Sequence, residues 1–367
     1  MARRVAAVVS FRLGGTDGVS VEARKWEGAL RALGFDVRRV AGELLDGGRP
    51  GDVTLPWLAI EPRAGTRAAP AELERVVGDV DVLVVENVCS LPLNAEAAGA
   101  TARVAQRADV PVVLHHHDLP WQRATTARVT DIPPDAPHVV HATINARSRA
   151  ELVARGIPPA RAVHVPNCFD VDTRPGDRPA TRAALGFRPD EVVVLQPTRA
   201  IERKNVPGGL SFATGLQRAL PDRRVRYWLT GPAEDGYGPT LDALVRDAAV
   251  PVTIAPVGDV ADAYAAADVV VFPSTWEGFG NPLVEATIAR RLVVTGPYPV
   301  REELAAIGLS SPSIDDVEDV IRWLRAPDDA RIERNLDAVR RHLSIATLPA
   351  RLADVLARAV VPEERTA

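Results

Sequence analysis

Short Val-rich hydrophobic runs recur along the chain and alternate with longer segments rich in Ala, Leu and Arg. Continuous apolar runs are typical of strands in a parallel sheet that helices cover on both faces, and the alternation predicts βαβ units. The predicted strands cover residues 5–10, 35–40, 80–85, 111–115 and 138–142 in the first half, and 191–196, 224–230, 252–255, 268–272 and 292–295 in the second. We therefore expect an α/β fold with two parallel sheets.

The segment after the first predicted strand has the clearest helical pattern. From Val19 to Leu33, apolar residues follow one another at intervals of four, three, four and three residues, which places them on one helix face. Gly34 comes next and is typical of the residue just beyond a helix end. The sequence therefore predicts a helix with one buried face at 19–33.

The stretch between the two sets of strands has no hydrophobic period. Residues 166–179 are rich in Pro, Asp and Gly and predict an interdomain linker. The predicted domains are 1–170 and 171–345, each doubly wound around a parallel sheet, followed by a C-terminal helix in 346–367. Ligand sites are expected at the carboxyl ends of the strands and in the cleft between the domains. The pattern does not assign residues 40–75, and residues 313–362 read as helices.

Composition narrows the class of protein. Hydrophobic residues make up 46% of the chain and charged residues 25%, as in ordinary globular proteins, and no apolar run has the roughly 20 residues that a transmembrane helix needs. A net charge of −4 argues against a nucleic-acid partner. Cys89 and Cys168 are too few for a disulfide framework, so a cytoplasmic location is expected. The sequence leaves open whether the chain forms a homodimer.

The clearest candidate binding site follows the predicted strand at 268–272. A loop containing Gly278 and Gly280 precedes a helix predicted to start at Pro282, with Asn281 as its N-cap. The glycines allow a ligand to approach the backbone closely, and the free N–H groups of a helix start attract phosphate. This stretch is therefore expected to hold a phosphate-containing ligand.

Two carboxylates flank this helix start. Glu277 lies in the loop and Glu285 lies one turn into the helix, so both can face a ligand rich in hydroxyls. The stretch resembles the E-x7-E motif of retaining glycosyltransferases of the GT-B fold, family 4 (glycosyl transferases group 1). The resemblance implies that Glu277 contacts hydroxyls of the donor sugar and that Glu285 binds the nucleotide ribose. The neighbouring donor-binding positions would be Gly278, Phe279, Gly280 and Asn281. Two solvated acids after a strand are the plain structural alternative.

A basic pair follows the predicted strand at 191–196. Arg199 and Lys204 are similar to the family's R-x4-K pattern, whose two cations hold the donor diphosphate, and Arg203 is placed to assist. Fixed cations would stabilise the negative charge that the leaving group gains. Only two of the 44 basic residues are Lys, which sets Lys204 apart, although Lys25 has no such explanation. Catalytic roles are therefore predicted for Arg199 and Lys204.

A glycine-rich loop follows the first predicted strand. Gly14 and Gly15 do not fit the spacing of a dinucleotide fingerprint, but the loop is similar to the turn that approaches the donor phosphates and the acceptor in this family. Ser20 and Lys25, on the following helix, are candidate acceptor contacts. A plain βα turn is the structural alternative.

A run of histidines, residues 115–117, follows the fourth predicted strand and precedes Asp118. Consecutive residues of a strand point in different directions, so the run does not predict a metal centre. The family resemblance implies instead that His117 lies near the donor sugar and takes part in catalysis. Asn87 and Ser90 are candidate acceptor-side residues. The Asp pairs at 79/81 and 170/172 are interpreted as structural, so no metal and no cofactor are expected.

The resemblance favours a retaining hexosyltransferase with two Rossmann-like domains facing a cleft. The donor would be a nucleotide-sugar, with UDP preferred and GDP next, the acceptor an unidentified hydroxyl, and the product α-linked. In this fold the C-terminal helix packs back on the N-terminal domain. The alternatives are a GT-B nucleotide-sugar 2-epimerase, a pseudo-glycosyltransferase that couples cyclitol units, and a non-enzymatic binder of nucleotide-sugars.

Overall fold

The computed structural model describes residues 4–123 and 126–359, and the chain divides into two compact units. Unit 1 contains the described residues up to Cys168 and those from Ile345 on, and unit 2 contains Phe169–Ser344. The predicted boundaries at 170/171 and 345/346 lie within two residues of these. The predicted C-terminal helix is present in unit 1 as α13 (Leu348–Leu356), and the end of its predicted range, 360–367, lies outside the described residues.

Unit 1 is built on a parallel sheet in the strand order β3-β2-β1-β4-β5-β6-β7. Adjacent strands pair in register, so that Ser10 lies beside Glu86 and Glu86 beside His115. The strands are β1 (Arg4–Leu13), β2 (Phe35–Leu44), β3 (Val53–Thr54), β4 (Val82–Glu86), β5 (Val112–His116), β6 (Val139–Thr143) and β7 (Ala162–His164).

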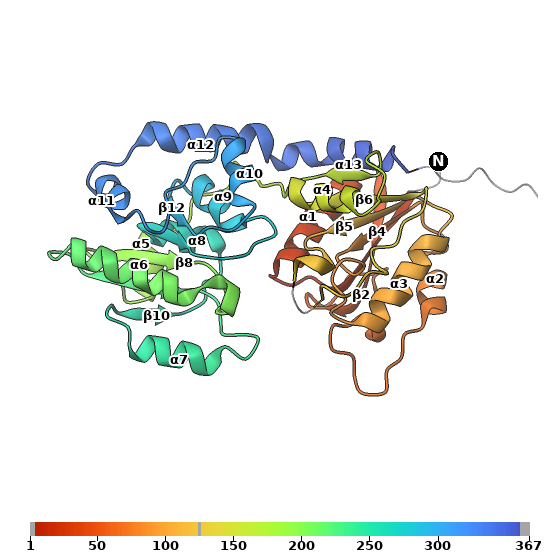
Figure 1. The fold of residues 1–367 in the computed structure, drawn as a ribbon, viewed down its shortest axis with the longest axis horizontal. Coiled ribbons are helices and arrows are strands. Elements are labelled where there is room, and N and C mark those ends of the chain that lie inside the picture. The colour runs from red at the N-terminus through yellow and green to blue at the C-terminus, as the bar shows by residue number, and fades with distance from the viewer. Residues whose placement is uncertain (1–3, 124–125, 360–367) are drawn as a thin grey trace, which may run out of the picture. The chain divides into compact units, whose positions relative to one another are not determined.

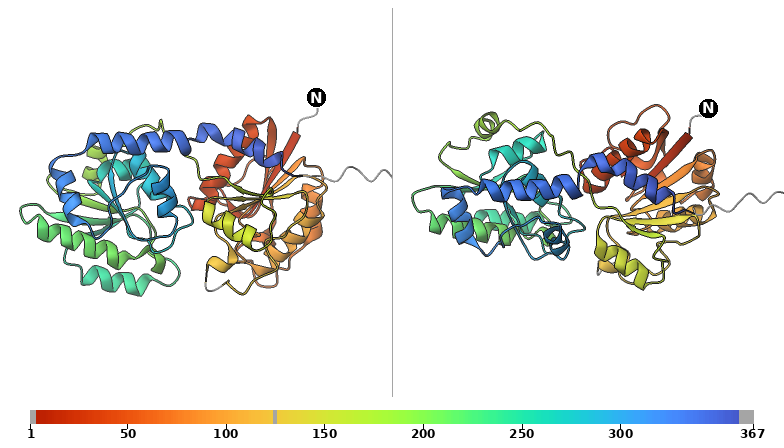
Figure 2. Two further views of the ribbon diagram at one scale, coloured as in Figure 1. Left: turned by 45° about the horizontal axis from the view of Figure 1, so that its top comes forward. Right: turned by 90° about the horizontal axis from the view of Figure 1, so that it is seen from above.

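Helices cover both faces of this sheet (Figure 1). Alternate strand residues point to opposite faces, so Val82 and Val84 pack with α1 and α13, whereas Leu83 and Val85 pack with α2 and α3. The helix α13 lies against α1, as both views of Figure 2 show. The helices of unit 1 other than α13 are α1 (Gly18–Ala32), α2 (Pro70–Val77), α3 (Ala95–Arg107) and α4 (Ala146–Ala154), with 3-10 turns η1 (Pro56–Leu58), η2 (Pro120–Gln122) and η4 (Ile345–Thr347).

Unit 2 has a smaller parallel sheet in the order β10-β9-β8-β11-β12. Its strands are β8 (Val192–Gln196), β9 (Val225–Leu229), β10 (Val252–Ile254), β11 (Val269–Phe272) and β12 (Leu292–Thr295). One face packs with α6 and α11 around a core that includes Leu216 and Val320. Outside this core, α8 and α9 contact the strands, α5 packs on α8, and α12 packs on α9. The helices are α5 (Arg178–Ala184), η3 (Glu202–Lys204), α6 (Val206–Ala219), α7 (Gly238–Arg246), α8 (Val260–Ala266), α9 (Asn281–Ile288), α10 (Arg301–Ala306), α11 (Val317–Arg325) and α12 (Asp329–His342).

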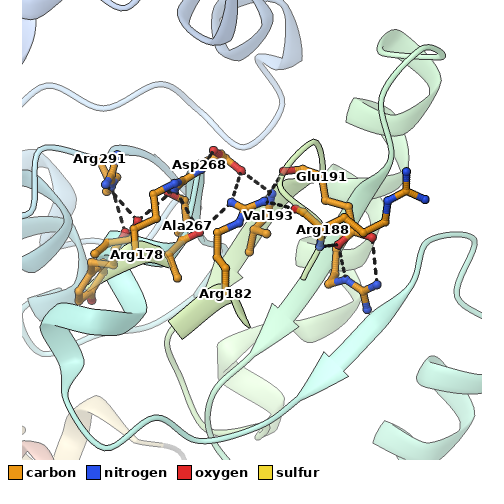
Figure 3. A network of polar contacts seen from close by, with 12 residues as sticks. Arg178, Arg182, Arg188, Glu191, Val193, Ala267, Asp268 and Arg291 are labelled. Carbon is orange, nitrogen blue, oxygen red and sulfur yellow. Dashed lines mark hydrogen bonds and ion pairs between the residues drawn. The ribbon is translucent and has the colours of Figure 1, made fainter. Parts of the chain in front are cut away.

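A network of arginines fixes the amino ends of β8 and β11 (Figure 3). Arg178 donates to the carbonyls of residues 265–267 at the end of α8, where a helix leaves its carbonyls without intrahelical donors, and also to Asp268 at 2.6 Å. The buried Arg182 contacts the same carboxylate at 3.2 Å. Asp268 accepts in turn from the Val193 amide at 2.8 Å. The first helix of unit 2 is therefore tied to the centre of its sheet, at the end opposite the predicted donor site.

Each of the ten predicted strands corresponds to an observed strand, with ends shifted by a few residues. The pattern missed β3 and β7, which are only two and three residues long. The unassigned region 40–75 contains the end of β2, β3, η1 and the start of α2. The predicted helix at 19–33 is observed as α1, with Gly34 in the left-handed region at φ 86° just beyond it.

Candidate functional site

Polar clusters lie where the strand order of each sheet reverses. In unit 2 the reversal is between β8 and β11, and the loops that follow these strands carry Lys204 and Glu277. In unit 1 it is between β1 and β4, where Gly14 and Glu86 stand at the carboxyl ends. In doubly wound sheets such reversals are where ligands bind. Gly14 in unit 1, and Lys204 and Glu277 in unit 2, therefore lie at the positions that the topology favours, whereas His117 follows β5, the strand beside β4.

In unit 2 the loop after β11 and the loop after β8 meet in an ion-paired cluster. The Nζ of Lys204 lies 2.6 Å from Oε1 of Glu277, and Arg203 Nη1 lies 3.1 Å from its Oε2. Lys204 and Glu277 are both buried, with 9% and 8% of their surfaces exposed. Burial alone would raise the pKa of Glu277, but the charges of Lys204 and Arg203 outweigh it and hold the pKa below its usual value. Glu277 is therefore ionised, with two cations on one carboxylate.

Hydrogen bonds hold these two loops together. Asn205 adopts a left-handed conformation (φ 50°) after η3 and caps α6, and its Nδ2 donates to the carbonyl of Pro273 at 3.2 Å. The Thr275 amide donates to the Arg203 carbonyl at 2.9 Å. From the end of β8, Gln196 donates to the Lys204 carbonyl at 3.0 Å. The positions of Arg203 and Lys204 relative to Glu277 are thus fixed by the backbone as well as by the ion pairs.

The helix that follows Glu277 starts one residue earlier than predicted. Its N-cap is Gly280 and Asn281 is its first residue, so the predicted cap role of Asn281 was wrong. Gly280 has φ 109°, a value that L-residues with a side chain rarely adopt, and a Cβ there would lie 2.4 Å from the hydroxyl of Tyr298. Glycine is needed because the backbone both turns sharply and packs against this ring.

Three other predicted donor residues have different partners. Glu285 in α9 accepts from the Tyr264 hydroxyl at 2.7 Å. Arg199 pairs with Glu234 and is more exposed than Lys204, with 38% of its side-chain surface accessible. Phe279 is buried and stacks on Phe169, with ring centroids 6.2 Å apart. Arg199 and Lys204 do not share a carboxylate in the described structure. A joint role of the two therefore requires a ligand that contacts both side chains.

The glycine-rich loop of unit 1 packs tightly on its neighbours. Gly14 has φ 80°, and a Cβ there would lie 2.5 Å from the carboxylate of Asp46. The buried Arg39 holds Asp46 at 2.8 Å, and this contact lowers the pKa of Asp46 to about 2. The side chain of Asp17 accepts from the Ser20 amide and caps α1. Gly14 and Gly15 thus bring the backbone close to the start of α1, as a ligand-binding turn requires.

The histidine run lies on a buried carboxylate that the sequence did not single out. Oε2 of Glu86 lies 2.8 Å from Nδ1 of His115 and 3.1 Å from Nε2 of His117. His115 and His117 are two residues apart and therefore point to the same face of the sheet. Trp26 of α1 stacks on the His115 ring, with centroids 4.0 Å apart. The signal in the sequence was an acid at the last position of an otherwise apolar strand.

Charge in this cluster is distributed unevenly. Glu86 is fully buried, which alone would raise its pKa, but His115 and His117 lower that pKa to about 2. Burial lowers the pKa of His115 below its usual value. Burial acts in the same direction on His117, but the hydrogen bond to Glu86 and the charges of Glu86, Glu22 and Asp118 together outweigh it, and the pKa of His117 is raised. The cluster is therefore a Glu86 carboxylate, a neutral His115 and a His117 that favours the protonated form.

The remaining histidine of the run faces the other way. His116 Nδ1 lies 2.6 Å from the hydroxyl of Ser90, and its Nε2 lies 3.1 Å from Nδ1 of His141. Asn87 accepts from the backbone amide of His117 at 3.1 Å. Ser90 and Asn87, predicted to line the acceptor side, are buried and hold the histidine run in place.

Among the described residues, Glu86, His115 and His117 are the group whose ligating atoms lie close enough, within 4.8 Å of one another, to be considered for a metal ion. Both imidazoles already hydrogen bond to one carboxylate oxygen, so the geometry satisfies these donors without a metal. The Asp pair at 79/81 is engaged elsewhere, because Asp79 pairs with Arg38 and Asp81 accepts from the Val5 amide.

The described part of the chain contains no helix long and apolar enough to cross a membrane.

Sequence comparisons identify relatives of both parts of the chain. Residues 200–324 match the family model described as "Glycosyl transferases group 1". The chain is 27% identical to mannosylglucosylglycerate synthase of Thermotoga maritima, in an alignment covering 97% of this chain and 99% of that protein. It is 33% identical to D-inositol 3-phosphate glycosyltransferase of Kineococcus radiotolerans over 58% of this chain and 52% of that relative. The predicted resemblance to this group of glycosyltransferases is confirmed.

Solved structures show the same fold. The Anabaena protein HepE in complex with UDP and glucose superposes with a TM-score of 0.73 at 18% identity, covering 96% of this chain and 99% of that one. WaaG, a glycosyltransferase involved in lipopolysaccharide biosynthesis, gives a TM-score of 0.69 at 16% identity over 96% of this chain and 99% of that one. The predicted GT-B fold is confirmed.

Proposed function

We propose that this glycosyltransferase of group 1 transfers a hexose from a nucleotide-sugar, UDP-linked by preference and GDP-linked next, to a hydroxyl acceptor with retention of anomeric configuration. The observation that carries the proposal is the buried Glu277 with Lys204 and Arg203 bound to it, at the sheet reversal of unit 2. A carboxylate and two cations in one place suit a ligand that has hydroxyls on one part and phosphates on another. Unit 2 is therefore assigned to donor binding.

Each part of the donor has a candidate partner in unit 2. Lys204 and Arg199 would hold the diphosphate. Glu277 would accept hydroxyls of the sugar and Glu285 those of the ribose. In the structure Glu277 holds Lys204 and Arg203 at the site, so a bound diphosphate would find these cations already ordered. Such preorganised cations cost little reorganisation when charge develops on the leaving group.

The chemistry that these groups support is attack on the face from which the diphosphate leaves. An inverting reaction needs a general base behind the anomeric carbon, and double displacement needs a carboxylate nucleophile there. Glu277 is engaged by two cations, which makes it a weak base and a poor nucleophile. In the proposed route the acceptor oxygen bonds to the anomeric carbon, the bond to the diphosphate breaks, and a diphosphate oxygen takes the acceptor proton. No metal is required, because the cations carry the neutralising charge.

The names of two relatives suggest which acceptors to test. One is named for mannosylglucosylglycerate and the other for D-inositol 3-phosphate. The glycerate in the first name and the inositol phosphate in the second are both small acids that carry hydroxyl groups. We propose an acceptor of this chemical class, with unit 1 supplying His117 and the glycine-rich loop. A glucosylated glycerate and inositol phosphates belong in the first panel of acceptors.

Donor binding is tested most directly by thermal stability in the presence of UDP-, GDP- and ADP-sugars. A ligand at 100 times its Kd stabilises the protein by about 2.7 kcal/mol, so at least one nucleotide-sugar should raise Tm by several degrees. Lys204→Ala should diminish this shift, whereas Arg218→Ala, a change at an exposed arginine of α6, should keep it in full. If no nucleotide-sugar raised Tm, the assignment of unit 2 to the donor would be wrong.

A further inference from the structure

Two of the three groups in the cluster of unit 1 are too deeply buried for a substrate to contact them. Glu86 has 0% of its surface exposed, and His115 has 1%. The His117 side chain, by contrast, has 8% exposed. Of the three groups, His117 is therefore the most exposed to solvent, and the fully buried Glu86 contacts its ring. Any effect of Glu86 on the reaction must pass through His117.

The hydrogen bonds of the cluster define what Glu86 does to that ring. An ionised carboxylate only accepts, so His117 Nε2 must carry the proton that it shares with Oε2 at 3.1 Å. His115 donates to the same oxygen from Nδ1, and the Trp26 ring stacks on it. The other oxygen, Oε1, is buried and has no hydrogen-bond partner among the described residues. The carboxylate is thus directed at the two imidazoles through one oxygen.

We propose that Glu86 is a positioning residue, which fixes the orientation of the His117 imidazole, keeps a proton on its Nε2 and so presents its Nδ1 edge to the substrate. The proposal rests on the proposed function, in which His117 contacts the substrate. Asn87 fixes the backbone of His117 at the same time, because its Oδ1 accepts from the His117 amide at 3.1 Å. Two consecutive residues at the end of β4 therefore set both the main chain and the ring of one histidine.

Charged groups from several elements face this ring. Glu22 of α1 is buried and pairs with Lys25 at 2.6 Å, and Asp118 follows in the chain. These acids and Glu86 favour the imidazolium, against the burial that opposes it, so the pKa of His117 is raised. A raised pKa means that the protonated ring persists to higher pH than usual and is lost as pH rises through that pKa. If the protonated ring is the active form, activity should fall on the basic side.

Glu86→Gln tests the proposal, because it removes the charge and keeps the shape. Kinetics of sugar transfer should show kcat lowered by about 10²-fold, the low end for a displaced proton donor, with KM for the donor changed less than twofold. Loss of a partner negative charge lowers a histidine pKa, so the basic limb of the pH profile should move to lower pH. In a His117→Ala background, Glu86→Gln should cost nothing further.

A matched control is Glu27→Gln, which removes another buried, ion-paired glutamate of unit 1 that lies on α1 and contacts Arg31 and Arg49. It should leave the pH profile unchanged. An unchanged profile in Glu86→Gln, or an equal loss with and without His117, would overturn the proposal. Stoichiometric metal bound to the purified protein and lost in Glu86→Gln would overturn it as well, because the cluster would then be a metal site.

A measurement on the wild-type protein keeps the proposal testable if Glu86→Gln fails to fold. Nitrogen-15 NMR of labelled histidine side chains, with His117→Asn for assignment, should show Nε2 of His117 protonated and a titration midpoint above the ordinary value of about 6.5. An unprotonated Nε2 would contradict the role given to Glu86. If the wild type transferred sugar to no acceptor, the proposed function would fail, while this spectrum would still decide whether Glu86 sets the state of His117.

Discussion

At the residue scale, the donor side depends on one glutamate that two cations share. Glu277 contacts Lys204 through one oxygen and Arg203 through the other. The spacing of Arg199 and Lys204 along the chain predicted that the two cations act together on one diphosphate. In the structure, Arg199 pairs with Glu234, whereas Lys204 pairs with Glu277. Sequence spacing could indicate which residues are chemically suited to the site. It could not indicate their partners, because those contacts join positions 35 to 74 residues apart.

Removal of either predicted clamp residue should slow the chemical step. Arg199→Ala and Lys204→Ala should each lower kcat by about 10²–10³, the scale of one lost electrostatic donor, because leaving-group charge is larger in the transition state than in the ground state. Steady-state kinetics with Arg218→Ala as the exposed control would measure this. Near-normal turnover in both clamp variants would show that the assigned cations do not act on the leaving group.

At the scale of elements, the strands were predictable because each is a continuous apolar run buried by helices on both faces. The strands β3 and β7 were not predicted, because they are too short to show a hydrophobic period. For example, β3 consists only of Val53 and Thr54. The site was predictable where local chemistry marks it, as at Gly280 and Glu277. Glu86 escaped because a single acid in an apolar strand carries no spacing signal. Its role appears only when β5 lies beside β4.

The start of α9 requires glycine. Gly280→Ala should destabilise the protein by about 1–3 kcal/mol, because the residue has φ 109° and a Cβ would meet the Tyr298 hydroxyl at 2.4 Å. It should also weaken nucleotide-sugar binding, since the helix amides would move. Gly238→Ala is the control, because a Cβ there meets nothing within 4 Å and its φ is ordinary. Equal effects of the two variants on urea denaturation would contradict this explanation.

The arginine network at the other end of the sheet should matter for stability and not for chemistry. Arg182 is buried and donates to Asp268 and to the backbone carbonyls of residues 188, 191 and 266. Its removal would leave these groups without that donor. Breaking a buried ion pair in this way costs about 3–5 kcal/mol. Arg182→Ala should therefore lower the unfolding free energy by that amount, whereas Arg188→Ala, whose exposed side chain pairs only with Asp190 among the contacts described, should change it by less than about 0.5 kcal/mol. A fully stable Arg182→Ala protein would be inconsistent with the role of this network.

At the scale of the whole molecule, two doubly wound units each place polar groups at a sheet reversal. Unit 2 concentrates cations around Glu277, and unit 1 concentrates a carboxylate and imidazoles around His117. We propose that this division separates the binding of an anionic donor, in unit 2, from acceptor chemistry, in unit 1. The family match over 200–324 lies within unit 2, where the sequence motifs were also strongest.

Metal independence is proposed for the enzyme as a whole and can be tested on it. Because Lys204, Arg203 and Arg199 carry the positive charge that a metal would otherwise supply, treatment with EDTA should leave transfer activity within about twofold of the untreated value. Metal analysis of the purified protein should accompany the assay. A large loss restored by Mg²⁺ or Mn²⁺ would show that a carboxylate or histidine site of this chain binds a required metal.

The central claim is transfer with retention, and the configuration of the product tests it most directly. Glu277, which we propose contacts the donor sugar, has both of its oxygens engaged by cations, so neither a free base nor a free nucleophile is assigned behind the anomeric carbon. Proton and one-bond carbon–proton couplings at the anomeric position of the isolated product give its configuration. An α-configured nucleotide-sugar should yield an α-linked product. A β-linked product from the same donor would contradict the account.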